Sequence, residues 1–126
     1  MEPVSREYLR GLRAQKIEEN RIKFVEDIVW TIFNQVKQTA TNTTQTCIQH
    51  QVQYEVHSHN GQISIRDNMP DILARLQGLF PDSSVNFKTL SRGHDGKMYD
   101  IADIDEKMKP FIDIRRKQDF IVIDWS

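Results

Sequence analysis

Residues 5–38 read SREYLRGLRAQKIEENRIKFVEDIVWTIFNQVKQ, with one glycine and no proline. Helix-forming Leu, Arg, Lys, Glu and Ile dominate this stretch, and Ser5 is a good N-cap, so we predict one long helix. On a helical wheel counted from Arg6, a first apolar stripe of Tyr8, Leu9 and Leu12 centres near ~245°. A second stripe centres near ~95°. It consists of Val25, Ile28, Val29, Ile32 and Val36.

The two stripes point in directions that one straight helix cannot bury against the same surface. Supercoiling moves a stripe by only ~20° per heptad, or about 50° over this distance. We therefore expect either a break in the helix within residues 11–20 or two halves of the helix that pack against different surfaces. A helix from Arg6 to Gln38 would be ~50 Å long, whereas a chain of this size has a radius of gyration of roughly 14 Å.

A helix that overhangs a small globule and carries apolar side chains needs a partner, so the sequence predicts a homodimer. Trp30, near ~240° on the wheel, lies away from the second stripe. With Phe24 and Phe33 it makes that half of the helix apolar around much of its circumference, which is typical of a helix buried on several sides. The predicted interface is either Leu9 with Leu12, or the set Val25, Ile28, Val29, Ile32, Phe33 and Val36.

The remaining sequence predicts a linker over residues 39–46 and an α+β domain over residues 47–126. Residues 39–46, TATNTTQT, are poor helix formers and good turn formers. CIQHQVQYEV, residues 47–56, alternates apolar and polar side chains, as a half-buried strand does. Asn60-Gly61 is a strong hairpin signal, which leads to a returning strand with Ile63 and Ile65.

A second helix is predicted to begin at Asn68, with Pro70 in its first turn. Short strands follow around Val85 to Thr89 and at Met98 to Ile101, and residues 102–112 carry a weak helical pattern. FIVIDWS, residues 120–126, is apolar on both faces, which favours a central strand. The predicted fold is therefore α+β with the order α-β-β-α-β-β-α-β and a mixed or antiparallel sheet of four or five strands. Its later part is compatible with a ferredoxin-like order.

Length and composition limit the function classes. A chain of 126 residues is normally one domain. With 17 basic and 18 acidic residues, the net charge of −1 argues against nucleic-acid binding by bulk charge. The single cysteine, Cys47, rules out an internal disulfide and fits a reducing compartment. No apolar run reaches the ~18 residues of a membrane span, and the first residues lack the apolar core of a secretion signal.

Four arginines fall within an ~80° arc of the long helix. They are Arg6, Arg10, Arg13 and Arg21. Guanidinium groups on one helix face can hold phosphates, so a nucleic-acid-binding module is a second hypothesis for the function. The alternative interpretation is a solvated face with ion pairs between residues four apart, because several glutamates lie nearby.

Metal or catalytic chemistry is the third hypothesis and has the least support. His57 and His59 share one strand face and could hold a metal. A further ligand would come from His94 or the aspartates, with no spacing that supports it. Asp100, Asp103 and Asp105 suit the positive end of a helix as well as a cation. No nucleophile–base pair stands out. We therefore expect no enzyme activity, no catalytic residue, no bound metal and no cofactor.

Two short motifs in the C-terminal part carry a resemblance. LFPDSSVNF, residues 79–87, and FIVIDWS, residues 120–126, resemble small proteins of unassigned function in the nucleocytoplasmic large (giant) DNA viruses. The resemblance implies a virion or virus-factory protein in the host cytoplasm, with the nucleus left open, and it carries over no catalytic residue. We thus expect a non-enzymatic structural or interaction protein that acts as a homodimer, with other viral or host proteins as further partners.

Overall fold

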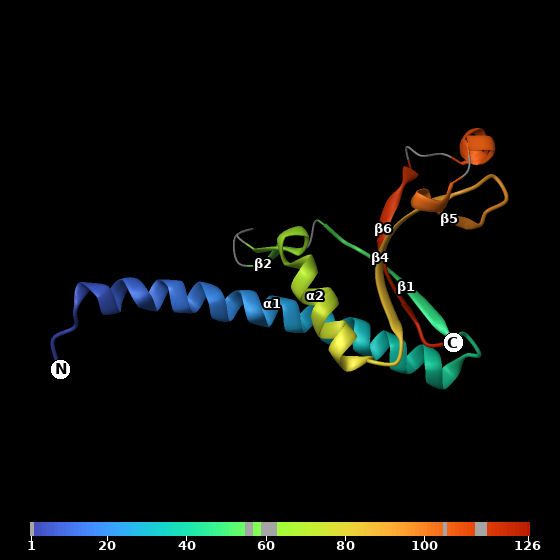
Figure 1. Cartoon of the computed structure of the whole chain (residues 1–126). Helices are drawn as coiled ribbons and strands as arrows, with labels where there is room; N and C mark the ends of the chain where they lie inside the picture. Colours follow the sequence, from blue (N-terminus) through green and yellow to red (C-terminus); the bar gives the residue numbers. More distant parts are fainter. Residues whose placement is uncertain (1, 55–56, 59–62, 105, 113–115) are drawn as a thin grey trace.

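The computed structural model describes residues 2–54, 57–58, 63–104, 106–112 and 116–126. It begins with one unbroken helix, α1 (Arg6–Asn42), so the break considered within residues 11–20 is not present. Ser5 is its N-cap, as predicted, and the Tyr8 backbone N–H donates to Ser5 Oγ at 3.1 Å. Figure 1 shows the N-terminal half of α1 extending away from the rest of the molecule.

The long helix ends later than the sequence predicts. Residues 39–42 are helical, and the linker is confined to residues 43–46. The Thr43 backbone N–H and hydroxyl both donate to the Thr39 carbonyl, at 3.0 and 2.7 Å, and close the last turn. Val36 is buried and α1 packs against the neighbouring strand, so tertiary contacts outweigh the weak helix propensity of this threonine-rich end.

The main sheet has four strands in the order β1-β6-β4-β5, and every neighbouring pair is antiparallel. The strands are β1 (Cys47–Gln51), β4 (Ser84–Arg92), β5 (Met98–Asp100) and β6 (Gln118–Asp124). The predicted α+β class with a four- or five-stranded sheet is confirmed. The central position predicted for FIVIDWS is also confirmed, because β6 lies between β1 and β4 and places Ile123 between Ile48 and Val85.

The ferredoxin-like order is not formed. That order needs a second crossover helix before the last strand. The segment predicted to be weakly helical instead forms two 3-10 turns, η1 (Ile101–Asp103) and η2 (Glu106–Phe111), and Pro110 lies inside the second. Neither turn is an α-helix that could cross the sheet, and β6 lies between β1 and β4.

Two very short strands, β2 (His57–Ser58) and β3 (Ile63–Ser64), pair antiparallel ahead of α2 (Ile65–Leu79). The predicted Asn60-Gly61 turn lies outside the described residues. Helix α2 begins at Ile65 because the Ser64 hydroxyl accepts from the Asp67 N–H at 3.2 Å. Asn68, expected to be the cap, lies one turn inside the helix, where its side-chain amide donates to the Ser64 carbonyl at 2.8 Å.

The core lies between the two helices and one face of the sheet (Figure 1). Its completely buried side chains come from all three parts. They are Ile32, Ile72, Leu76, Ile121 and Ile123. The second stripe of α1 supplies one wall of this core, with Val25, Val29, Ile32 and Val36 buried and Ile28 packed beside them. The four buried side chains are therefore not accessible for the dimer contact predicted from the sequence, whereas Ile28 keeps part of its surface exposed.

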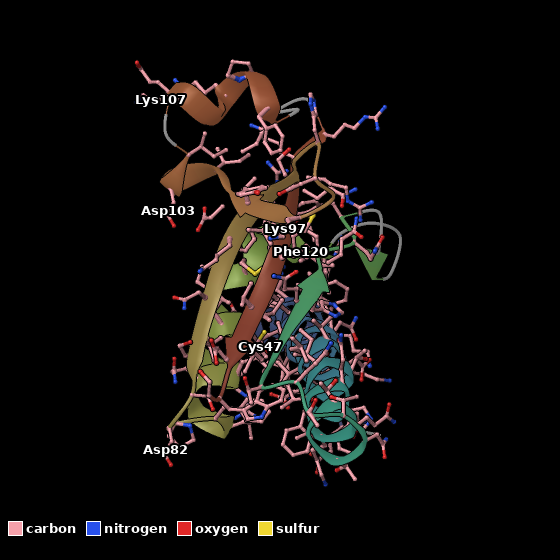
Figure 2. The ribbon with its side chains drawn as sticks, turned by 90° about the vertical axis from the view of Figure 1, so that its right-hand side faces the viewer. Cys47, Asp82, Lys97, Asp103, Lys107 and Phe120 are labelled. Atoms are coloured by element: carbon pink, nitrogen blue, oxygen red, sulfur yellow. The ribbon has the colours of Figure 1, made fainter. Side chains whose placement is uncertain are left out.

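No α-helix among the described residues covers the opposite face of the sheet. In Figure 2, α2 lies behind the strands, and the β1 side chains that alternate with Ile48 are exposed, as the sequence predicts. The turns η1 and η2 lie at the end of the sheet away from the helices, where Asp103 and Lys107 are far from Asp82 (Figure 2). Of the two described α-helices, only α1 extends well beyond the part of the molecule where helices and sheet pack together (Figure 1).

Candidate interaction surface

Residues 6–19 of α1, which we call the distal segment, are exposed along their whole length. The polar residues that fix this segment to the domain lie just after it. Arg21 Nε and Nη2 donate to Glu18 at 3.0 and 2.7 Å, and Nη1 donates to Asp71 on α2. One turn further, Arg75 holds Glu26 through two hydrogen bonds of 2.6 and 3.0 Å. The helix is thus fastened to α2 from Arg21 onward and is unsupported before it.

Electrostatics at this junction agree with the geometry. The hydrogen bonds from Arg21 lower the pKa of Glu18, and those from Arg75 lower the pKa of Glu26. The same contacts raise the pKa of both arginines. Because Arg21 is committed to two carboxylates, it is not part of an open phosphate-binding face, although the sequence grouped it with the other three arginines.

The outer stripe is a line of large, exposed apolar side chains on α1. Tyr8, Leu9 and Leu12 remain 56%, 54% and 43% exposed, and Trp30 is 65% exposed. Trp30 lies near ~240° on the helical wheel, the same arc as the first three residues and opposite the buried stripe. The outer stripe spans 23 residues, Tyr8 to Trp30, or about 33 Å of helix. It contains Leu9 and Leu12 from the predicted interface and leaves them accessible.

Trp30 is held in place by neighbouring aromatic rings. Its ring stacks on Phe33 with centroids 6.3 Å apart, and Phe33 stacks on Phe80 at 5.6 Å. The Lys37 ammonium lies 5.5 Å from the Phe33 ring centroid. The sequence indicated burial on several sides for this half of the helix. The structure buries Phe24, half-buries Phe33 and exposes Trp30, because α2 and the sheet cover only part of the circumference.

The remaining arginines of the predicted basic face lie on the distal segment. Arg6, Arg10 and Arg13 are all exposed. Within the described residues, none of the three has a carboxylate within 4.0 Å, so the ion pairs that the alternative interpretation expects are not formed there. This face adjoins the outer stripe without overlapping it.

Two hollows elsewhere were not predicted from the sequence. A cavity of about 550 Å³ at the end of the sheet away from the helices is lined by Arg92, His94, Met98 and Arg116. A more apolar groove of about 470 Å³ lies between α2 and the sheet, with Leu73 and Phe87 in its lining. The first has the charge to attract an anion, and the second offers apolar contact, but each is open and shallow.

A polar network not predicted from the sequence ties β6 to the segment after β1. The Tyr54 hydroxyl and the Thr89 hydroxyl both donate to the Asp119 carboxylate, the second at 2.7 Å. Burial, followed by the bond to Asp119, raises the pKa of Tyr54 to about 12. The Arg66 guanidinium lies 4.9 Å from the Tyr54 ring centroid. The side chains of Tyr54, Thr89 and Asp119 are thus hydrogen-bonded to one another, and the network stabilises the fold.

The residues considered for metal binding are not brought together where the structure describes them. The side chains of His57, His59 and Asp105 lie outside the described part of the chain, and Asp100 caps η1 by accepting from the Ala102 N–H at 3.0 Å. Among the described residues, no three His, Cys, Asp or Glu side chains form a group that could hold a metal ion. None of the described helices has the length and apolarity to cross a membrane.

Comparisons with known proteins add no functional assignment. No family model, no curated protein and no solved structure matches this chain significantly.

Proposed function

We propose that this chain is a non-enzymatic interaction protein that forms a homodimer through the outer stripe of α1. The observation that carries the proposal is the alignment of four large apolar side chains on the helix face turned away from the core. Single exposed apolar residues are normal on a protein surface, but here three of them gather within residues 8–12 and Trp30 lies on the same helix face, an arrangement that favours an interaction site.

The position of the outer stripe favours a helix as the partner. The distal segment has no packing of its own within the described residues, and an isolated helix of its length is marginally stable in water. Pairing with another helix would bury Leu9 and Leu12 and stabilise the helical conformation at the same time. A second copy of the chain supplies a matching apolar face at equal concentration.

Light scattering on the full chain over a range of concentrations tests the proposal. We expect a mass of two chains for the wild type and of one chain for the variant Leu9→Glu/Leu12→Glu. The matched control is Ile17→Glu, because Ile17 is 46% exposed on the same segment but lies off the outer stripe. A wild-type mass of one chain at high micromolar concentration contradicts the proposal, as does equal loss of dimer in the control.

Nucleic-acid binding is the second candidate, favoured by the exposed Arg6, Arg10 and Arg13. A salt titration of duplex DNA affinity tests it, since each phosphate contact contributes about −0.9 to the slope of log affinity against log salt. Replacing the three arginines by glutamine should reduce the slope by about three contacts. Absence of binding at low salt eliminates this candidate and leaves the dimer proposal unaffected.

The resemblance to small proteins of giant DNA viruses supports a further proposal on location. We place the dimer in the virion or in the cytoplasmic virus factory, with other viral or host proteins as additional partners. Mass spectrometry of purified virions tests this, and the detection of the chain only in uninfected cellular material contradicts it.

A further inference from the structure

We propose that two copies of the protein pair their α1 helices antiparallel, with residue i of one helix opposite residue 42 − i of the other. This inference rests on the proposed dimer and adds the direction, the register and the contacts of the pairing. It follows from which side chains the structure leaves on the outer face of α1 and from the spacing between them.

The outer face of α1 follows a heptad repeat from Leu9 to Phe33. One set of positions, spaced seven residues apart, consists of Leu9, Lys16, Lys23 and Trp30. A second set, three residues later in each heptad, consists of Leu12, Glu19, Glu26 and Phe33. Positions with this spacing line the seam of a two-helix coiled coil. Here the apolar members lie at the two ends of the repeat, and the charged members lie between them.

In an antiparallel pair, each member of the first set faces a member of the second set on the other helix. With the register proposed here, Leu9 meets the partner's Phe33, and Leu12 meets the partner's Trp30. In the middle, Lys16 meets the partner's Glu26, and Glu19 meets the partner's Lys23. The two-fold axis repeats each contact, so every apolar residue faces an apolar residue and every charge faces an opposite charge.

The other heptad-compatible pairings lack this match. A parallel pair places Lys16 against Lys16 and Glu19 against Glu19, and like charges in direct contact are unfavourable. An antiparallel pair shifted by one heptad in one direction places Leu9 against the partner's Glu26. The shift in the other direction places Trp30 against the partner's Glu19. Only the proposed register joins apolar with apolar and positive with negative throughout.

The structure leaves this seam accessible on each chain. Lys16, Glu19 and Lys23 are exposed, and the Glu26 side chain is 44% exposed while it accepts from Arg75. Phe33 is half-buried, and its ring stacks on Phe80 and on Trp30 of the same chain. Glu26 and Phe33 border the face of α1 that α2 covers, so the second helix would pack beside α2, with the Glu26 carboxylate shared between Arg75 and the partner's Lys16. The paired region from Leu9 to Phe33 is about 36 Å long.

A charge-exchange experiment tests the register. Lys23→Glu places two glutamates opposite each other at both central contacts, and we expect the dimer dissociation constant to rise roughly tenfold. The variant Glu19→Lys/Lys23→Glu restores opposite charges and should return the dissociation constant to near the wild-type value. The matched control is Arg10→Glu, which changes the net charge equally away from the seam. The register is overturned if the dissociation constant of the double variant stays as high as that of Lys23→Glu while that of Arg10→Glu equals the wild-type value.

A distance measurement separates the direction of pairing from the existence of the dimer. A spin label is attached at Ala14→Cys, an exposed site away from the seam, in a Cys47→Ser background. The antiparallel register offsets the two labels by 14 residues, or about 21 Å along the helix axis, whereas a parallel pair has no axial offset. A dimer with closely spaced labels overturns the antiparallel arrangement alone. A monomer by light scattering overturns both this inference and the proposed function.

Discussion

The loss of unfolding free energy in Ile32→Ala tests whether the side of α1 that carries Ile32 is the one that packs in the core. Ile32 is completely buried between α2 and the sheet. The substitution removes three carbons, worth about 0.8 kcal/mol each in transfer free energy, or ~2.4 kcal/mol. The cavity that remains adds to this, so we expect a loss of about 3–4 kcal/mol in the free energy of unfolding. Urea unfolding at one fixed, low protein concentration measures it without interference from the dimer equilibrium.

The control for this measurement is Trp30→Ala, two residues away on the same helix. Trp30 is 65% exposed and its described ring contact is with Phe33, so its removal should cost only about 0.5–1.5 kcal/mol of unfolding free energy. The same variant should weaken the dimer strongly in light scattering. The reasoning is refuted if Trp30→Ala destabilises the fold as much as Ile32→Ala, or if Ile32→Ala costs less than about 1 kcal/mol.

Three further substitutions test separate features. Gly93→Ala should lower the free energy of unfolding by about 1–3 kcal/mol, because the new Cβ would lie 2.7 Å from the Tyr99 ring. Gly11→Ala meets nothing within 4 Å and should raise the helicity of the distal segment, as circular dichroism would show. Burial lowers the pKa of His50, so the unfolded chain binds more protons below pH 6.5 and stability falls as the pH drops through that region. His50→Gln should remove this component from pH-dependent unfolding curves, and an unchanged pH dependence would contradict the assignment.

Local signals in the sequence predicted the elements better than their ends. Ser5 was correctly identified as a cap, because capping depends on one hydroxyl and the next three residues. The end of α1 and the start of α2 were displaced by several residues, since both depend on contacts made after folding. The strand order could not be predicted, because it depends on where β6 inserts and nothing local to β6 specifies its neighbours.

The candidate surface was only partly predictable for a related reason. Periodicity identified two stripes on α1 but could not say which one the domain would cover. The answer came from Ile72 and Leu76 on α2 and from Ile121 and Ile123 on β6, which close over the second stripe. Trp30 could be assigned to the outer face only once that coverage was known. The commitment of Arg21 to Asp71 on α2 likewise joins residues 50 positions apart.

Because α1 is unbroken, it connects the distal segment rigidly to the rest of the molecule. The C-terminal half of α1 packs in the core, and the distal segment carries neither proline nor a helix break. A partner that binds the distal segment therefore determines the orientation of the sheet as well as its position. Inserting or deleting four residues in α1 between the distal segment and the core would rotate the distal surface by about 40° relative to the sheet and move it by about 6 Å. The length of α1 therefore fixes both the distance and the rotation between a partner bound to the distal segment and the sheet.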